Sequence, residues 1–223
     1  MATYRNIRKV LNLPTLSASP SSGANGEMYF NTGDLSLYIY DGAWKKVTQS
    51  ATTPSYDWTA TAQQAKIVSS DLQEGDDYGY SVALDGDTAV VGARYEDTGG
   101  TSAGSVYVFT RSGTSWSQEA RLQPSDVAAG DNFGFSVSIE GDILAVGARY
   151  EETGATDGGS AYVFTRSGTS WSQQVKVTSS DIEATDRFGN DIEISGNTIL
   201  VGAESEDGGF SNDAGAAYTF VAG

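Results

Sequence analysis

Residues 133–173, FGFSVSIEGDILAVGARYEETGATDGGSAYVFTRSGTSWSQ, give the clearest indication of the fold of this chain. Apolar and polar residues alternate in it, as in the run SVSI at residues 136–139. A period of two indicates a β-strand with one buried face. Turn-forming residues such as the EGD triplet at 140–142 interrupt the alternation. The stretch therefore predicts short strands joined by tight turns, and no part of the chain shows the sustained apolar period of a helix.

The same pattern occurs three times along the chain. Residues 78–118 read YGYSVALDGDTAVVGARYEDTGGTSAGSVYVFTRSGTSWSQ, and residues 188–221 read FGNDIEISGNTILVGAESEDGGFSNDAGAAYTFV. Equivalent residues recur at a spacing of 55, which lengthens to 56 only after the last acidic loop. This spacing relates Asp71, Asp126 and Asp181, then Gly79, Gly134 and Gly189, then Gly92, Gly147 and Gly202, and finally Tyr107, Tyr162 and Tyr218.

Each repeat is expected to hold four strands. In the second repeat they are predicted near Trp116–Gln123, Phe133–Ile139, Ile143–Ala148 and Ser160–Thr165. A four-stranded unit of about 50 residues, repeated in tandem, is typical of a β-propeller blade. A β-solenoid is the competing repeat fold, but its rungs are usually much shorter than the repeat found here. The predicted fold class is therefore all-β, with three tandem four-stranded propeller-type blades.

Several motifs in these repeats point to a known family. Phe133-Gly134, then Val146-Gly147-Ala148, then GSAYVF at 159–164 and WSQQ at 171–174 resemble the FG-GAP repeat in its bacterial and phage form. That repeat is the blade unit of integrin-α-like propellers. The resemblance covers about residues 58–220. It implies a propeller-like fold and a function in binding or adhesion.

Calcium loops often lie between the two halves of such repeats. They need several oxygen ligands on about a dozen residues. At the corresponding places this chain has only LDGD at 84–87, IEGD at 139–142 and ISGN at 194–197, which are typical of two-residue hairpin turns. We therefore expect no metal site and no cofactor, with Ca²⁺ as the alternative. The acidic loops, which we expect to form a solvated rim or to gather cations loosely, are Glu96–Gly100, Glu151–Gly158 and Glu204–Asp213.

The repeat also predicts which residues are buried. If the three units share one fold, equivalent residues should occupy equivalent environments. Two apolar triplets are expected in the core, namely Val82, Val137 and Ile192, and Val91, Val146 and Val201. The glycines expected where strands crowd and a Cβ would clash are Gly92, Gly147 and Gly202.

The composition excludes several functions. The chain has 223 residues, with 13 Lys and Arg against 29 Asp and Glu, so its net charge is −16. A surface of that sign repels phosphate, and we expect no nucleic-acid partner. The chain contains no Cys and no His, which removes Cys–His and Ser–His–Asp catalysis. Pairs of carboxylates are explained by a solvated acidic surface, so we predict no catalytic residue and no enzyme activity.

The N-terminal quarter differs from the repeats. Residues 1–50 carry a net charge of +2, so residues 51–223 carry −18. Residues 26–47 have the pattern of a three-strand β-meander. This meander resembles a short module common near the ends of phage tail-fibre and other virion proteins. A degenerate partial blade is the alternative, because its YIY run and Trp44 mirror the end of a repeat.

These patterns predict two modules and a larger assembly. Three blades cannot close a propeller ring, which usually has four to eight. We therefore expect a homo-oligomer, with a trimer ahead of a dimer. The basic residues Arg5, Arg8 and Lys9 are expected to dock the chain on a larger particle. The expected domains are a docking segment and meander at 1–50, a linker at 51–57, and blades at 58–110, 111–165 and 166–223.

Arg94-Tyr95 and Arg149-Tyr150 are the candidate binding residues. Each pair follows a VGA motif directly and leads into an acidic loop. An exposed Arg-Tyr pair suits contact with a sugar or a protein. The alternative is that each Arg only neutralises neighbouring Asp and Glu residues.

Together these features predict a phage virion structural protein, such as a fibre, a tail adaptor or a capsid decoration. Its expected location is the virion, assembled in the host cytoplasm, and its expected partners are other virion proteins and a host-surface glycan or protein. The chain shows neither a secretory signal nor an apolar run that could span a bilayer, so we expect no membrane insertion. The alternative is a bacterial cell-surface or secreted FG-GAP adhesion module, which needs an export route.

Overall fold

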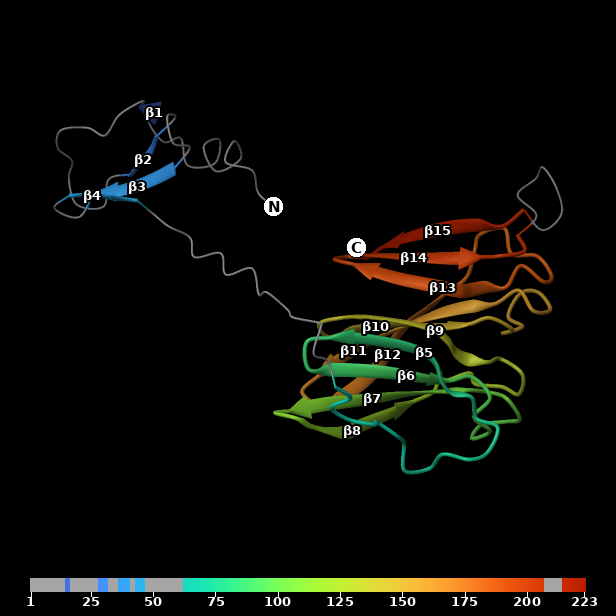
Figure 1. Cartoon of the computed structure of the whole chain (residues 1–223). Helices are drawn as coiled ribbons and strands as arrows, with labels where there is room; N and C mark the ends of the chain where they lie inside the picture. The colour runs from blue at the N-terminus through green and yellow to red at the C-terminus, as the bar shows by residue number, and fades with distance from the viewer. Residues whose placement is uncertain (1–14, 17–27, 32–35, 41–42, 47–61, 207–213) are drawn as a thin grey trace. The chain divides into compact units, whose positions relative to one another are not determined.

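The computed structural model of the chain describes residues 15–16, 28–31, 36–40, 43–46, 62–206 and 214–223. The chain divides into two compact units, Met1–Thr61 and Ala62–Gly223. Every regular element in the described ranges is a β-strand (Figure 1). The all-β prediction is therefore confirmed. The described residues form no helix of the length and apolar character needed to cross a membrane.

The described residues of the first unit form four short strands in one sheet, and their order in the sheet follows the chain. β2, β3 and β4 pair in antiparallel fashion, whereas β1 runs parallel to β2. The docking residues Arg5, Arg8 and Lys9 and the predicted linker at 51–57 lie outside the described residues. The bounds are β1 Thr15–Leu16, β2 Met28–Asn31, β3 Ser36–Tyr40 and β4 Trp44–Lys46.

The second unit contains three antiparallel sheets, each built from strands that are consecutive in the chain. The first sheet has β5 Tyr78–Asp85, β6 Thr88–Ala93, β7 Ser105–Ser112 and β8 Ser115–Leu122. The second has β9 Phe133–Glu140, β10 Ile143–Ala148, β11 Ser160–Ser167 and β12 Ser170–Val177. The third has, among the described residues, the three strands β13 Phe188–Ser195, β14 Thr198–Ala203 and β15 Ala216–Val221.

Sequence repeats and sheets are staggered by one strand. Trp116 begins the second repeat in the sequence, but its strand β8 pairs with β7 and completes the first sheet. Trp171 has the same place in β12, the last strand of the second sheet. The expectation that these strands open their blades is therefore wrong. The reason is local: a two-residue turn at Gly113-Thr114 joins β7 to β8, whereas a longer connection after Leu122 leads to the next sheet.

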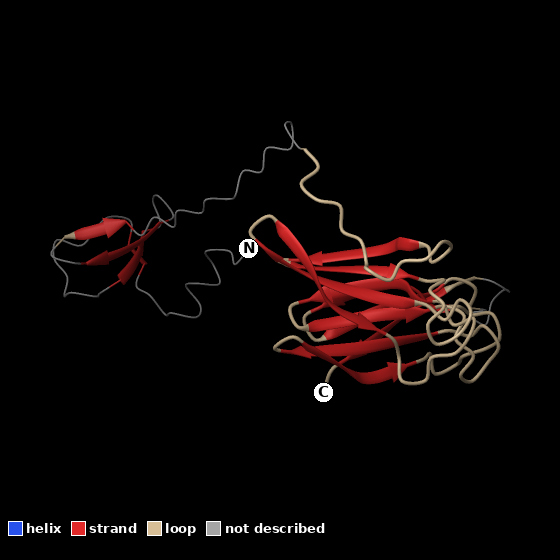
Figure 2. Ribbon diagram, turned by 90° about the horizontal axis from the view of Figure 1, so that it is seen from below, coloured by secondary structure: helices blue, strands red, loops and turns tan. Residues whose placement is uncertain are grey.

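The two ends of the strands differ in their connections. Two-residue hairpins close one end, where Gly86 and Gly141 have φ angles of 54° and 58°. Glycine adopts this left-handed conformation without strain, and such hairpins require it. Long loops gather at the opposite end (Figure 2). Because two of these loops, 94–104 and 149–159, begin with the Arg-Tyr pairs, the candidate site lies at this end.

The hydrophobic core lies between successive sheets. β9 packs on β5 and β6 of the first sheet, and β13 packs on β9 and β10 of the second. At the first junction, Phe133 and Tyr162 are fully buried, with ring centroids 5.6 Å apart in an edge-to-face arrangement. Such a pair adds about 1 kcal/mol beyond the burial of its area. Val106 and Val108 of the first sheet complete the same cluster.

The predicted core residues are buried only where a neighbouring sheet or segment covers them. Val91 and its two counterparts are buried, as expected. Ile192 is 4 % exposed, whereas its counterpart Val82 in β5 is 69 % exposed. The prediction for Val82 is wrong because its side of the first sheet is turned away from the second sheet. Among the described residues, only a short segment around Ile67 packs on that side.

The glycine triplet divides in the same way. A Cβ on Gly147 would overlap the carbonyl oxygen of Gly189 in the third sheet. A Cβ on Gly92 would likewise overlap the second sheet. At Gly202, the nearest heavy atom to such a Cβ would be the Asp191 Cβ, 3.8 Å away, which is an ordinary contact. The predicted clash is therefore confirmed at two positions and wrong at Gly202, where no described sheet lies beyond the third.

Candidate binding surface

Arg94 follows β6 at the long-loop end and stacks on aromatic rings. Its Cζ lies 3.7 Å from the ring centroid of Tyr80 in β5 and 4.4 Å from that of Tyr95. Its Nε donates a hydrogen bond to Asp77 Oδ2 at 2.8 Å. A guanidinium group on an aromatic face contributes about 0.5–1 kcal/mol at an exposed site. Arg94 thereby fixes two tyrosines that are themselves 43 % and 37 % exposed.

Phe135 links this group to the second repeat. It stands in β9 where Tyr80 stands in β5, and the two ring centroids are 4.9 Å apart. Arg149 places its Cζ 4.8 Å from the Phe135 ring and 5.1 Å from that of Tyr150. Arg94 also approaches Phe135, at 5.5 Å. The structure thus brings the two predicted pairs to one ring. We call the set the Arg–aromatic row: Tyr80, Arg94, Tyr95, Phe135, Arg149 and Tyr150.

Both cations of the row are paired with acids. Arg149 forms an ion pair with Glu204 of the third repeat, and Glu204 also accepts a hydrogen bond from Arg187 Nη1 at 2.9 Å. The Arg149 Nε is buried and has no hydrogen-bond partner in the described part of the chain. The arginines therefore do neutralise acidic neighbours, as the alternative interpretation of the sequence expected. What the row offers a ligand is chiefly its exposed tyrosine rings.

The row ends at the third repeat. Asn190 occupies the place of Tyr80 and Phe135, and Glu204 occupies the place of Arg94 and Arg149. An amide and a carboxylate cannot continue a stack of guanidinium groups and rings. The aromatic surface therefore belongs to the first two repeats, and its exposed end is formed by the tyrosines of the first.

A second recurring group lies under the acidic loops. Glu151 is buried, and its carboxylate accepts from Ser160 Oγ at 2.6 Å and pairs with Lys176 Nζ at 2.8 Å. Lys176 also donates to Asp126 Oδ2 at 2.8 Å. The first acid of this loop is an internal anchor, so the expected solvated rim is wrong at this position. The first sheet holds the same group as Glu96, Ser105, Arg121 and Asp71.

Two buried carboxylates of the second repeat have opposite pKa shifts. Burial raises the pKa of Glu151, but hydrogen bonds from Lys176 and Ser160 outweigh it, and the net pKa is lowered. At Asp131, burial outweighs the hydrogen bond from the Ala128 backbone N–H, and the nearby Glu151 charge adds to it, so the pKa rises to about 6. Asp131 Oδ2 accepts that hydrogen bond at 2.7 Å. Its role is to anchor a turn.

The short turns considered as metal loops are hairpins. Asp85 pairs with Thr88 and Glu140 with Ile143 in the strand ladders. Asp85 Oδ2 accepts a hydrogen bond from the Gly141 backbone N–H at 2.6 Å, so this carboxylate joins two sheets. Within the described ranges, no three carboxylates are grouped as metal ligands would be. The absence of a metal in the whole protein stays a prediction.

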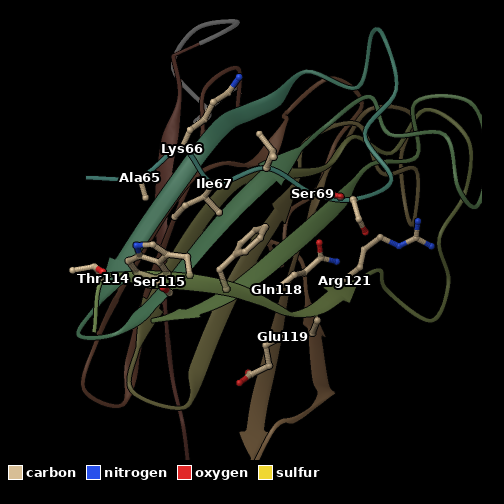
Figure 3. Close-up of a pocket in the computed structure, with 14 residues that line it drawn as sticks. Ala65, Lys66, Ile67, Ser69, Thr114, Ser115, Gln118, Glu119 and Arg121 are labelled. Atoms are coloured by element: carbon tan, nitrogen blue, oxygen red, sulfur yellow. The ribbon is translucent and has the colours of Figure 1, made fainter. Parts of the chain in front are cut away.

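A groove runs along the first sheet between residues 65–70 and strands β7 and β8, with a volume of about 760 Å³. Figure 3 shows Lys66 and Ile67 extending in opposite directions from this segment. Ile67 packs on the buried cluster that contains Val91 and Tyr107. The segment is nevertheless not paired with any described strand.

Comparison with known families agrees with this architecture. Residues 61–109, 116–164 and 171–220 each match the FG-GAP repeat, and together they make up more than half of the chain. The chain belongs to the FG-GAP repeat family. The resemblance seen in the sequence is thereby confirmed for the repeats, while its phage form and the kinship of the meander stay predictions. A search of curated proteins found no match.

The FG-GAP motif explains how the sheets stack. In each sheet the aromatic-Gly pair begins the first strand, and the Gly-Ala pair ends the second. Ser136 Oγ, which faces the Gly147 position, donates to Gly189 O of the next sheet at 2.8 Å. Ser81 Oγ donates in the same way to Gly134 O at 2.7 Å. The two halves of the motif therefore meet across each described junction between sheets, which makes it a packing device.

Sequence reasoning missed two parts of this surface. It did not include Tyr80 and Phe135 in the binding row, and it did not recognise Glu151 and Lys176 as a buried pair. The signal was the same spacing of 55, which relates Tyr80 to Phe135. Only the structure shows that these positions face the arginines.

Proposed function

We propose that this FG-GAP chain is a non-catalytic binding module whose Arg–aromatic row contacts a ligand on another surface. The row carries the proposal, because Tyr80 and Tyr95 stay exposed while Arg94 is held between their rings and Asp77. Rings fixed in advance lose little conformational freedom on binding a sugar ring or a protein side chain. FG-GAP repeats are generally binding modules without catalytic activity, which supports the same conclusion.

We further propose that the module belongs to a phage virion, as a fibre, tail adaptor or capsid decoration. The split between a basic N-terminal region and acidic repeats supports this setting, and so does the resemblance of the meander to virion proteins. Arg5, Arg8 and Lys9 would then dock on other virion proteins, and the repeats would face a host-surface glycan or protein. A bacterial surface adhesion module is the second candidate, and the family membership favours it equally.

The binding proposal is tested with the full chain on an array of bacterial surface glycans and on a panel of intact bacterial cells. The variant Tyr80→Ala/Tyr95→Ala should lose at least ten-fold in binding to whatever target the unmodified chain selects. Arg111→Ala is the matched control, because Arg111 also stacks on a ring, Trp116, but at the hairpin end. Equal binding by all three proteins would overturn the role of the row.

The setting is tested separately by mass spectrometry of purified phage particles. We expect peptides of this chain at a fixed ratio to the capsid protein. Their absence from the particles would remove the virion proposal and favour the bacterial one, while leaving the binding role of the row intact.

A further inference from the structure

The two outer faces of the sheet stack expose the residues that the inner junctions bury. We call the side of the first sheet that bears Val82 and Leu84 the front face. Both side chains are exposed there. On the back face, the far side of the third sheet, Leu200 is 45 % exposed, whereas its counterpart Val90 is fully buried at the first junction. The back face also exposes Asp191 and Glu193, which pair with Gly202 and Leu200 in the strand ladder. Exposed apolar residues on two faces of one molecule mark an interaction surface.

Glycine positions show that the two faces have complementary shapes. A Cβ on Gly134 would come within 2.8 Å of Ser105 O in the preceding sheet, whereas one on Gly79, on the front face, would meet nothing within 4 Å. A Cβ on Gly202, on the back face, would make only ordinary contacts with Asp191 at 3.8 Å or more, unlike one on Gly147. At an inner junction, Gly134 or Gly189 of one sheet packs on Gly92 or Gly147 of the preceding sheet. The front face carries the first kind of glycine, Gly79, and the back face carries the second kind, Gly202.

The segment 62–67 already occupies the place of a fourth strand from a preceding sheet. At the first inner junction, Leu122 at the end of β8 packs on the core of the second sheet. Ile67, which is 55 residues earlier, packs in the corresponding place on the first sheet. The first family match begins at 61, as the second begins at 116, and so aligns this segment with β8. Sequence and position therefore agree.

The third sheet is the sheet that has no fourth strand among the described residues. β15 pairs with β14 on one side only. Beside it lies a groove of about 430 Å³, lined by Gln174 of β12 and Phe220 of β15 among others. At the first junction the equivalent place holds Trp171, whose indole N–H donates to Glu119 Oε1, the counterpart of Gln174, at 2.9 Å. The edge and the groove together mark the position of a strand.

We propose that copies of this chain associate head to tail: the back face of one copy packs on the front face of another, whose segment 62–67 pairs with β15 as the fourth strand of the third sheet. The register is that of the second sheet, where Lys176 lies opposite Tyr162. Lys66 of the second copy then lies opposite Tyr218 of the first. This interface does not depend on the virion setting. It would cover part of Tyr80, because the counterpart Phe135 is 7 % exposed where the first sheet packs on it.

Charge supports the same register. Lys176 and Arg121 occupy equivalent positions in the fourth strands and both bind the two acids of their own sheet. Lys66 is the cation at the same spacing, 55 residues before Arg121. The corresponding acids of the third sheet are Asp181 and Glu206. In the proposed register Lys66 would lie beside this acidic group, in which Asp181 already accepts a hydrogen bond from Tyr218 of its own chain at 2.9 Å.

Two copies are the number that fits a closed ring. Each copy supplies three sheets, and propellers usually contain four to eight. Six is the multiple of three within that range. A head-to-tail contact that does not close would instead produce filaments. Of the two assemblies expected from the sequence, this arrangement supports the dimer in place of the trimer.

One residue weakens the proposed junction. Asp191 stands where Ser81 and Ser136 donate a hydrogen bond to the next sheet. A carboxylate cannot donate to the corresponding carbonyl oxygen of Gly79, so the junction between copies lacks this bond. Asp191→Ser should therefore tighten association, which we expect to see as at least a three-fold lower dissociation constant.

The experiment uses one variant for each face of the full chain, with mass measured by sedimentation equilibrium. The unmodified chain should have twice the 23.4 kDa of one copy. Gly202→Ala blocks the back face and Val82→Glu blocks the front face, so each variant alone should sediment as a single copy. Both residues are uncovered in the separate chain, so both variants should keep the far-ultraviolet circular dichroism of the original.

Mixing the two variants identifies the head-to-tail geometry. The back face of the Val82→Glu copy and the front face of the Gly202→Ala copy are both intact, so the mixture should regain the mass of two copies. A mixture that stays at one copy would overturn the proposal, and so would variants that keep the mass of the unmodified chain. An unmodified chain that is monomeric at micromolar concentration would also overturn it and would assign the edge of β15 to another segment or partner.

Discussion

Gly147 and Gly202 hold the same place in consecutive sheets, yet their surroundings differ completely. The first lies at a junction where the next sheet leaves no room for a Cβ, and the second has room for one at ordinary contact distance from Asp191. Val82 and Ile192 differ in the same way, one exposed and one buried. In this FG-GAP chain, burial is therefore a property of the junction and not of the residue. The repeat preserves most residue types at the outer faces, but Asp191 and Glu193 of the back face replace small residues of the inner junctions.

Gly147→Ala should give the largest effect and separate the inner junction from the outer face. The new Cβ must displace the backbone of the third sheet, at a cost of about 3 kcal/mol or more. The melting temperature should fall by about 10 °C. Gly202→Ala should change it by less than about 2 °C. Both melting temperatures are measured by calorimetry in chains that also carry Val82→Glu, so that association between copies does not contribute. Equal falls in melting temperature would contradict the difference between the inner junction and the outer face.

Glu151→Gln tests whether the acidic loops are anchored or merely solvated. The change weakens the contact with Lys176 beneath the loop, and we expect a loss of about 2 kcal/mol in unfolding free energy. Glu152→Gln is the control, because Glu152 is exposed. Urea unfolding at pH 7 gives both values. If the two variants lose the same amount, the loop acids are a solvated rim after all.

The pH dependence of the same pair follows from the direction of the shift. The folded-state pKa of Glu151 lies below its usual value of 4.5. Its charged form therefore adds stability that is present above that value and is lost as the pH falls through the folded-state pKa. Glu151→Gln should accordingly reduce the loss of stability of the chain on acidification below about pH 4.5.

Asp131→Asn should have the opposite effect. Because the pKa of Asp131 is raised from 3.8 to about 6 in the folded chain, its charged form opposes folding at neutral pH. The unmodified chain should gain stability from this group as the pH falls from 7 towards 5. The variant should be more stable at pH 7, by no more than about 3 kcal/mol, and should lose this pH dependence. A variant less stable than the original at pH 7 would contradict the assignment.

Thr185→Gly should produce a smaller gain in the free energy of unfolding. It tests a position at which the third repeat differs from the other two. Thr185 has a φ of 73°, whereas its counterparts Gly75 and Gly130 have φ angles of 100° and 95°. A β-branched residue is strained there, and glycine should raise the unfolding free energy by about 1 kcal/mol. The reverse change, Gly130→Thr, should lower it by a similar amount. Thermal melts of both variants check the sign, and a loss at Thr185→Gly would contradict it.

The sequence predicted most of the fold because its repeat is a strong signal. The alternating runs predicted the strands, and the short turns around Gly86 and Gly141 predicted the hairpins. Assigning each strand to its sheet required the pairing itself, since the spacing of 55 is unchanged whether Trp116 opens one sheet or closes another. The sequence could not predict the exposure of Val82 either, because a repeat pattern does not show which sheets are covered by another sheet.

The candidate site was predicted in part. The Arg-Tyr pairs were found because they follow the VGA motif, but their contact with Phe135 depends on two sheets lying side by side. Glu151 was assigned to a solvated loop because acidic residues surround it in the sequence. Its burial follows from Lys176, which arrives from a different strand. Interactions between elements far apart in the chain were the part that sequence pattern did not reveal.

If the two outer faces are halves of one junction, an engineered disulfide should join two copies of the chain across it. The chain has no cysteine of its own. In the second sheet Val175 lies opposite Val163, so the proposed register places Ala65 of one copy opposite Thr219 of the other. Directly opposite strand residues have Cα atoms about 4.5–5.5 Å apart, within reach of a disulfide.

The measurement is non-reducing electrophoresis of the full-length variant Ala65→Cys/Thr219→Cys after mild oxidation, beside the two single variants. We expect the double variant to run as a covalent pair of chains and to return to a single chain with reductant. Neither single variant should form the pair. A double variant that stays a single chain under oxidation would contradict the head-to-tail junction.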